Sequence, residues 1–224
     1  MGIAERRSRE KEKRRQDILD AAEKLFFSKG FDAVTMDDVA EAAELSKGTL
    51  YLYFKNKIDI YFAISCRGLE ILISLFSQVL QGTEPGLIKV KGIGEAYCHF
   101  FKDYLNYFNA LIFWDVHMIE ANTDCPMADV CSELGNQALG LVTQAIASGV
   151  KDGSIRPDIE PAKAAIILWG QSTGILQFLA SKGEHFLKDH PSEFPFKDLD
   201  EVVKYSHEMM AFSLRNPSQG GNKP

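Results

Sequence analysis

Apolar residues recur along most of this chain with the three-and-four spacing of amphipathic α-helices. The first run predicts a helix over about 14–29, and its buried stripe is Ile18, Ala21, Ala22, Leu25 and Phe26. Gly30 follows where a helix end favours a left-handed residue, and we expect Phe31 to fold back on Phe26. No stretch of useful length alternates like a β-strand. The pattern therefore predicts an all-α protein.

Two short helices are predicted next, joined by a tight turn at Glu44 and Leu45. We expect Thr35 to cap the first of them, with its hydroxyl accepting from the amide of Asp38. Ser46 caps the second, which covers about 47–54. Leu50 and Phe54 point inward in this register, and the outward residues are then Lys47, Thr49, Tyr51 and Tyr53. Asn56 opens a long fourth helix, with Asp59 three residues on.

The remainder reads as further helices separated by polar breaks. Helical runs cover about 87–121, 127–150, 161–182 and 199–214, which makes eight runs with the four before them, and we expect about nine helices in all. We therefore expect two domains, an N-terminal arm with short helices over 1–60 and a larger helical domain over 61–216. Residues 217–224 are rich in Gly, Pro, Ser and Asn and are expected to form a disordered tail.

Charge is unevenly distributed along the chain. The net charge is −6, yet residues 1–15 contain seven Lys or Arg and only three Glu. The first 60 residues carry twelve charges of each sign, so the whole negative excess lies beyond them. A basic arm on an acidic body suits an electrostatic footprint at one end. A solvated, frayed N-terminus is the alternative interpretation.

Several classes of function find no support in the sequence. The cysteines form no CxxC pair, and no spacing of Cys98, His99, His117 and Cys131 implies a metal site, so we expect reduced thiols, no metal and no cofactor. The chain contains no HExxH, GxSxG, P-loop or GxGxxG motif, which argues against an enzyme. The apolar run 164–169 is short for a membrane span, and no signal peptide is evident, so a cytoplasmic protein is expected.

Residues 35–57 have the pattern of a helix-turn-helix, two short helices of which the second is polar and basic on its outer side. A recognition helix must offer groups to phosphates and base edges in the major groove. Lys47 supplies charge, Gly48 permits close backbone approach and Thr49 can meet a base. The phenols of Tyr51 and Tyr53 can donate to phosphate, and Lys57 can hold the flanking backbone.

The stretch from Thr35 to Lys57, with 15–26 and 29–31 before it, resembles the DNA-binding domain of TetR-family transcriptional regulators. The resemblance covers about fifty residues closely. It implies that Thr35 caps its helix and touches phosphate and that Lys57 binds phosphate, while the DNA-facing residues are Lys47, Gly48, Thr49, Tyr51 and Tyr53. The family usually has glycine in the turn where this chain has Glu44. A left-handed Glu44 costs on the order of 1 kcal/mol and brings negative charge near DNA.

Aromatic residues are dense between Tyr97 and Glu120. Core packing accounts for many of them, but an aromatic-lined pocket for a small apolar or aromatic effector is the sharper hypothesis. The candidate effector-binding residues are Phe101, Tyr104, Phe108, Trp114, His117 and Trp169. The resemblance implies a helical domain that binds an inducer and changes the spacing of the two DNA-reading heads.

The helices at about 162–182 and 199–214 are more apolar than one buried face requires. By the resemblance they form a four-helix bundle between two subunits, and a homodimer would read a palindromic operator. The sequence thus favours a homodimeric repressor released from double-stranded DNA by a small, largely apolar effector. A DNA-binding structural or partner-recruiting protein without an effector is the alternative.

Overall fold

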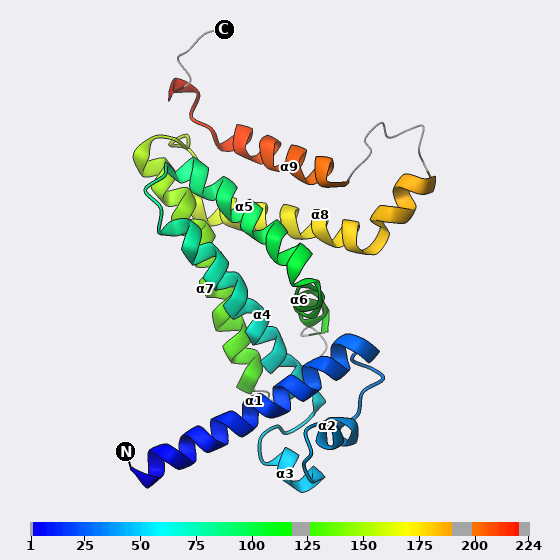
Figure 1. Ribbon diagram of the computed structural model, residues 1–224. Helices are drawn as coiled ribbons and strands as arrows, with labels where there is room; N and C mark the ends of the chain where they lie inside the picture. The colour runs from blue at the N-terminus through cyan, green and yellow to red at the C-terminus, as the bar shows by residue number, and fades with distance from the viewer. Residues whose placement is uncertain (1, 118–125, 190–198, 220–224) are drawn as a thin grey trace. The chain divides into compact units, whose positions relative to one another are not determined.

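The computed structural model describes residues 2–117, 126–189 and 199–219, and within them the side chains of 3, 113–117, 126, 182–189, 199 and 219 are not described. This part of the chain holds nine α-helices, one short 3-10 helix and no β-strand (Figure 1). The helices are α1 (Ile3–Lys29), α2 (Met36–Ala42), α3 (Lys47–Tyr51), α4 (Lys57–Leu80), α5 (Gly86–Asp103), α6 (Leu105–His117), α7 (Pro126–Asp152), α8 (Pro161–Asp189) and α9 (Leu199–Leu214). The predicted all-α fold class is confirmed.

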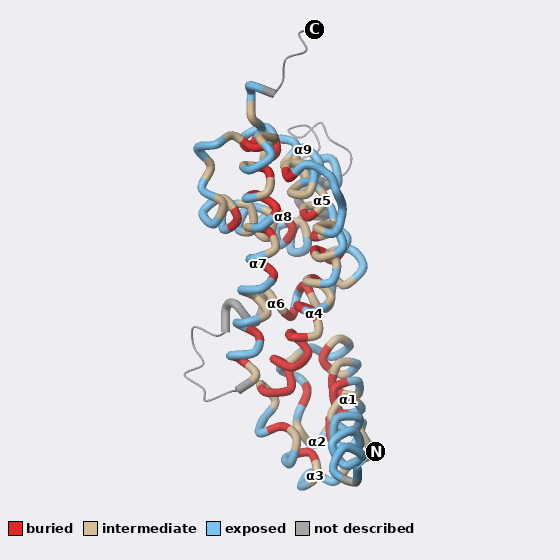
Figure 2. The backbone as a smooth tube through the Cα atoms, turned by 90° about the vertical axis from the view of Figure 1, so that its left-hand side faces the viewer, coloured by how far each residue is buried: buried red, intermediate tan, exposed pale blue. Residues whose placement is uncertain are grey.

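Helix α1 begins at Ile3, eleven residues before the start that the apolar pattern predicts. Its added turns lack an apolar stripe and are exposed along their length (Figure 2). Good helix formers and pairs four residues apart stabilise such a segment. Arg6 pairs with Glu10 at 2.8 Å, and Gln16 donates to Glu12 at 2.7 Å. The basic arm is therefore the first half of a continuous helix.

Three further segments differ from the sequence pattern. The aromatic run 87–121 is broken at Tyr104, whose backbone angles (φ −126°, ψ 38°) end α5, and α6 begins at Leu105. Helix α8 continues to Asp189 through residues that were predicted to form a connection. Pro217–Gln219, expected to be disordered, form a 3-10 turn, and the rest of that predicted tail lies outside the described residues.

The chain divides into two compact units. The first unit contains Met1–Glu70 and Leu105–Leu134, and the second contains Ile71–Tyr104 and Gly135–Pro224. The core of the first unit unites side chains from α1, α2, α3, α4 and the connection between α3 and α4, among them Ile18, Ala22, Phe26, Val39, Leu50, Phe54 and Ile60. Arg67 adds a polar tie between α4 and α1, with ion pairs to Asp20 at 2.8 Å and Glu23 at 3.0 Å.

Helices α5, α8 and α9 pack on one another in the second unit (Figure 1). The start of α5 lies so close to the end of α7 that a Cβ on Gly86 would stand 2.0 Å from the Gly149 nitrogen. Asp152 accepts from the Gly86 amide at 2.7 Å, and Gly153 turns the chain with φ 80°. Arg156 then donates to the carbonyl of Leu214 at 3.0 Å, which anchors the end of α9. These contacts hold the start of α5 and the ends of α7 and α9 together.

In the part of the chain that the structure describes, two helices are long and apolar enough to span a membrane by length and composition alone. Lys57–Leu80 has a mean hydropathy of 1.5 with 61% of its apolar window buried, as in a core helix. Pro161–Ser181 has a mean hydropathy of 1.2 with only 11% of its window buried in this chain. The six-residue run 164–169 is thus part of a longer apolar helix, so the short length of the run does not exclude a membrane span by that helix. The outer face of Pro161–Ser181 is thus largely uncovered in the single chain.

Candidate nucleic-acid interface and ligand cavity

Thr35 caps α2 as the sequence predicts, and Asp38 caps it in return, which was not predicted. The Asp38 amide donates to the Thr35 hydroxyl oxygen at 3.2 Å, and Asp38 Oδ2 accepts from the Thr35 hydroxyl at 2.6 Å and amide at 2.7 Å. These hydrogen bonds hold the pKa of the Asp38 carboxyl below its ordinary value. The cap fixes where α2 begins and leaves the exposed Thr35 at its positive end.

The turn between α2 and α3 passes through Glu44, which has φ 55° and is the only non-glycine residue with positive φ among the described residues. Leu45 donates from its amide to the carbonyl of Ala40 at 2.8 Å, so the turn closes with the hydrogen bond of a helix C-terminus. The expected left-handed conformation of Glu44 is confirmed.

Helix α3 is a single short turn of five residues. Ser46 caps it by accepting from the Thr49 amide at 3.2 Å, and the two hydroxyls lie 2.8 Å apart. Leu50 is fully buried beneath the helix, whereas Tyr51 is 46% and Leu52 is 77% exposed. Tyr53 is half-buried and packs against the core of the unit. The outward surface therefore consists of the exposed Lys47, Gly48, Tyr51 and Leu52, with the half-buried Thr49 among them.

The two lysines of the candidate interface have protein partners. Lys47 Nζ lies 2.7 Å from Asp37 Oδ1, and this contact raises the pKa of the Lys47 ammonium. Lys57 Nζ donates to the carbonyl of Phe31 at 2.8 Å and stands 4.3 Å from the centre of the Phe31 ring. Lys47 thus bridges α2 and α3, and Lys57 braces the loop after α1.

Gly48 has open space around it. A Cβ built at this position meets one atom within 4 Å, the Ser46 Oγ at 4.0 Å. No feature of the described fold thus requires glycine at this helical position. A glycine that the fold does not need is consistent with a surface that another molecule approaches closely.

Sequence reasoning missed two residues at this surface. Leu52 is 77% exposed directly after α3, and it was not selected because apolar residues were assigned to the core. Arg15 places its guanidinium 4.9 Å from the Phe54 ring and 3.2 Å from Met127 Sδ. The sequence offers no local signal for this packing, because the partners are 39 and 112 residues away.

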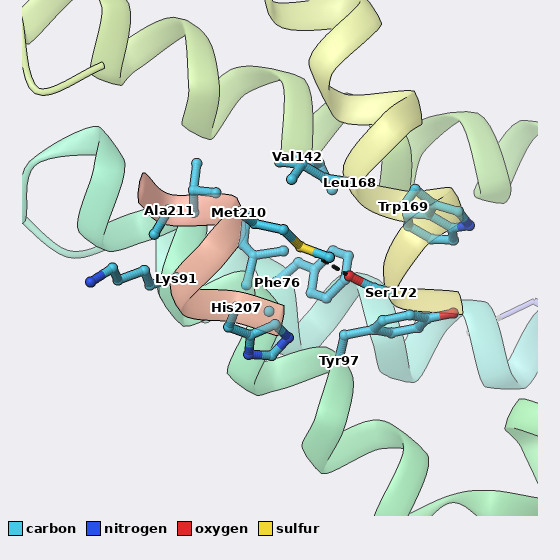
Figure 3. A pocket seen from close by; sticks show the side chains of 13 residues that line it. Phe76, Lys91, Tyr97, Val142, Leu168, Trp169, Ser172, His207, Met210 and Ala211 are labelled. Carbon is cyan, nitrogen blue, oxygen red and sulfur yellow. Dashed lines mark hydrogen bonds between the residues drawn. The ribbon is translucent and has the colours of Figure 1, made fainter. Parts of the chain in front are cut away.

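The second unit contains a narrow apolar cavity of about 50 Å³ (Figure 3). Tyr97 and Trp169 lie with ring centres 5.5 Å apart, and each meets Phe76 edge-on at 6.3 Å. The Tyr97 hydroxyl is 2.9 Å from the Thr173 hydroxyl. Other lining residues are Val90, Ile93, Val142, Leu168, Ser172, His207 and Met210. The volume is much smaller than the roughly 300–1,000 Å³ of sites for drug-sized molecules.

A wider polar groove of about 620 Å³ adjoins this cavity between α5 and α9. Lys91 and His207 line both spaces, and Lys102 and Lys204 line the groove alone. Burial lowers the pKa of His207, whose Nε2 lies 3.8 Å from Cys98 Sγ. Burial also raises the pKa of the Cys98 thiol to about 11, which disfavours its thiolate at neutral pH.

The predicted effector residues do not gather at one place. Trp169 lines the cavity, but Phe101 and Tyr104 are not among its lining residues, and Tyr104 stacks on Phe100 at 5.9 Å instead. Phe108 is fully buried within the first unit. The side chains of Trp114 and His117 lie outside the described residues. The aromatic-rich stretch between Tyr97 and Glu120 did not point to the lining residues from α4 and α9, because these are distant from it in the sequence.

An all-α chain that displays a capped helix-turn-helix with an open outer face is a helix-turn-helix DNA-binding protein in its architecture. Residues 18–64 match the family described as bacterial regulatory proteins, tetR family. The transcriptional activator FasR of Mycolicibacterium smegmatis is 32% identical over 90 residues, which cover 40% of this chain and 41% of FasR. The repressor KstR2 of the same organism is 27% identical over 149 residues, which cover 66% and 70% of the two chains.

Solved structures share the fold as well. The regulator FadR from Bacillus subtilis in complex with stearoyl-CoA has a TM-score of 0.66 at 16% identity, covering 89% of this chain and 99% of that one. Residues 18–64 of this chain therefore belong to the TetR family of bacterial regulatory proteins. The predicted family membership is confirmed.

Proposed function

We propose that this protein is a homodimeric, sequence-specific DNA-binding repressor that a small, largely apolar effector releases from its operator. The observation that carries the DNA-binding part is the outer face of α3, where Lys47, Gly48, Thr49, Tyr51 and Leu52 are held outward on a buried Leu50. Thr35, Tyr53 and Lys57 flank it. In this proposal residues 1–60 read DNA, and the larger domain, 61–216, binds the effector and the second subunit.

The dimer accounts for the apolar outer faces of α8 and α9. Ile166 is 61% and Phe212 is 82% exposed in the single chain, and large apolar patches mark interaction sites. A second copy packed on 162–182 and 199–214 buries these side chains. The exposed apolar helix Pro161–Ser181 is then explained by a protein interface and not by a membrane. Two heads then read half-sites about 34 Å apart or somewhat more on a palindrome. A protein of this kind works in the cytoplasm, with its DNA.

For the effector we propose the second-unit cavity and the adjoining groove. The aromatic box of Phe76, Tyr97 and Trp169 suits an apolar group, and the groove supplies Lys91 and His207 at its mouth. The relative crystallised with stearoyl-CoA is consistent with an elongated apolar ligand. At about 50 Å³ the cavity must widen to admit one, and binding that favours a widened state shifts the population of DNA-binding states.

The small cavity volume also favours the second candidate, a DNA-binding protein without an effector. The two differ in one measurement, the change in intrinsic fluorescence when apolar acids or acyl thioesters of increasing chain length are added. The chain has two tryptophans, and Trp169→Phe identifies the response of the cavity. A Trp169 response together with loss of operator binding supports the effector. No response to any chain length leaves the second candidate.

The DNA-binding proposal is tested by fluorescence anisotropy with genomic fragments upstream of the protein's own gene. Tyr51→Ala should weaken specific binding by about tenfold or more and leave the unfolding midpoint unchanged, because the exposed ring contributes little to the core. Leu105→Ala, at a 42% exposed side chain at the start of α6, is the control, because it lies outside both the candidate DNA surface and the proposed dimer helices. Equal affinity of Tyr51→Ala and the parent would contradict the assigned surface.

A further inference from the structure

Two cysteine thiols on neighbouring helices of the first unit face each other. Cys66 lies on α4 and Cys131 on α7, 65 residues apart in sequence, and their sulfur atoms are 2.6 Å apart. The Cys131 thiol donates to the carbonyl of Phe62 at 3.1 Å, and the Cys66 thiol donates to the carbonyl of Met127 at 3.9 Å. Each thiol is thus held by the other helix.

The separation of the sulfurs lies between two reference distances. Non-bonded heavy atoms rest at roughly 3.5–4.0 Å, whereas a disulfide joins its sulfurs at about 2.05 Å. A contact of 2.6 Å therefore needs a movement of only a few tenths of an ångström to reach bonding distance. The apolar wall around the pair, made by Phe62, Leu69, Ala128 and Leu134, fixes both side chains in this approach.

We propose that Cys66 and Cys131 form a site of reversible oxidation, which closes into an intrachain disulfide when the protein meets a hydroperoxide. Cys66 is 5% exposed and Cys131 is fully buried, so Cys66 is the thiol that the oxidant reaches first. Attack of the Cys66 sulfur on hydrogen peroxide gives a sulfenic acid and one water. The Cys131 sulfur then displaces the hydroxyl group, which leaves with the thiol proton as a second water.

The disulfide ties α4 to α7 inside the unit that carries the helix-turn-helix. Helix α4 begins with Lys57, and its first turn holds the Asn56 and Asp59 cap. Cytosolic disulfides in most organisms are transient and serve redox sensing. The proposal stands apart from the effector cavity, because the pair belongs to the other unit, and it does not depend on the proposed dimer.

The test uses the full chain with Cys98→Ser and Cys125→Ser, which keeps only the pair. Incubation of the folded protein with hydrogen peroxide should remove both titratable thiols and lower the mass by two hydrogens, about 2 Da. Trypsin should then release residues 58–67 linked to 103–151, and dithiothreitol should restore both thiols. The unfolding midpoint of the oxidised form should rise by about 5–15 °C, since the bridge closes a long loop of the unfolded chain.

Two single variants test the order of attack. In Cys131→Ser the Cys66 sulfenic acid has no second thiol, and dimedone should trap it, whereas Cys66→Ser should show several-fold less labelling. The proposal is overturned if both thiols of the folded pair variant persist under conditions that oxidise the urea-unfolded chain. It is equally overturned if the product is an interchain disulfide on a non-reducing gel or a sulfinic acid, two oxygens heavier, at Cys66.

Discussion

The ammonium group of Lys57 donates to the carbonyl oxygen of Phe31 at 2.8 Å and stands over the ring of the same residue at 4.3 Å. One lysine thereby fastens the loop after α1 to the start of α4. It approaches the Asp32 carbonyl at 3.5 Å as well. An ammonium carries three hydrogens, so the two carbonyls leave one for a DNA phosphate.

Lys57→Ala should therefore have two effects. Loss of the hydrogen bond and the ring contact should lower the free energy of unfolding by about 1 kcal/mol. Loss of one phosphate contact should weaken binding to all DNA sequences alike and reduce the slope of log K against log salt by about 1. Urea unfolding and anisotropy titrations at several salt concentrations measure both. Lys55→Ala, at an exposed lysine two residues away, controls for charge alone. A normal stability would show that the Phe31 contact contributes nothing.

Gly48→Ala separates the needs of the fold from those of DNA. The added methyl group meets one atom, at 4.0 Å, and alanine is the better helix former, so stability should stay equal or rise by up to about 1 kcal/mol. If α3 enters the groove with its backbone close to DNA, the same methyl group should weaken operator binding by tenfold or more. Thermal unfolding and anisotropy on one sample give both numbers. Unchanged affinity would mean that Gly48 does not face DNA.

Glu44 is tested by Glu44→Asn and Glu44→Gln. Asparagine tolerates the left-handed φ of 55° better than glutamate, so Glu44→Asn should stabilise the protein by up to about 1 kcal/mol, and Glu44→Gln should not. Both variants remove a negative charge near the candidate interface and should raise DNA affinity at low salt by similar factors. The strain and the charge are thereby measured separately. Equal stability of the two variants would show that the turn is unstrained.

The sequence was sufficient for features that depend on local chemistry. The Thr35 cap, the left-handed Glu44, the Asn56 cap of α4 and the contact of Phe31 with Phe26, with ring centres 5.7 Å apart, are as predicted. Each arises within a few residues, where capping rules apply. The family resemblance likewise rests on one continuous segment, residues 18–64.

Features that depend on distant residues were beyond sequence reasoning. The cavity combines Phe76, Tyr97, Trp169 and His207 from four helices, and only Trp169 was selected. The partners of Lys47 and Lys57 lie ten and 26 residues away. The pair of Cys66 and Cys131 shows no spacing motif, because its helices meet through tertiary packing. Periodicity identifies a buried face, and it does not identify what that face meets.

The dimer is tested on its proposed apolar face. Phe212→Glu places a charge at a side chain that is 82% exposed in the single chain, so it should leave the monomer fold intact. In the proposed interface that charge would be desolvated, and the dimer dissociation constant should rise by at least tenfold. Light scattering measures the dimer dissociation constant, and a titration with palindromic DNA measures the accompanying loss of binding. Val130→Glu, at a 42% exposed apolar side chain of α7, is the control and should remain dimeric. A dimeric Phe212→Glu protein would exclude this face.

His207 should make stability depend on pH. Burial lowers its folded pKa below the ordinary 6.5, while the nearby Glu95 partly opposes the shift. The unfolded chain therefore takes up this proton first as the pH falls, and stability is lost below about pH 6.5 until the folded histidine also titrates. His207→Gln removes the group, so the difference in unfolding free energy between pH 7.5 and pH 5.5 should shrink relative to the parent. His99→Gln, at an exposed histidine of α5, is the matched control. An unchanged pH dependence in His207→Gln would show that this side chain is as well solvated in the folded protein as in the unfolded chain, and the cavity mouth would then be open to water.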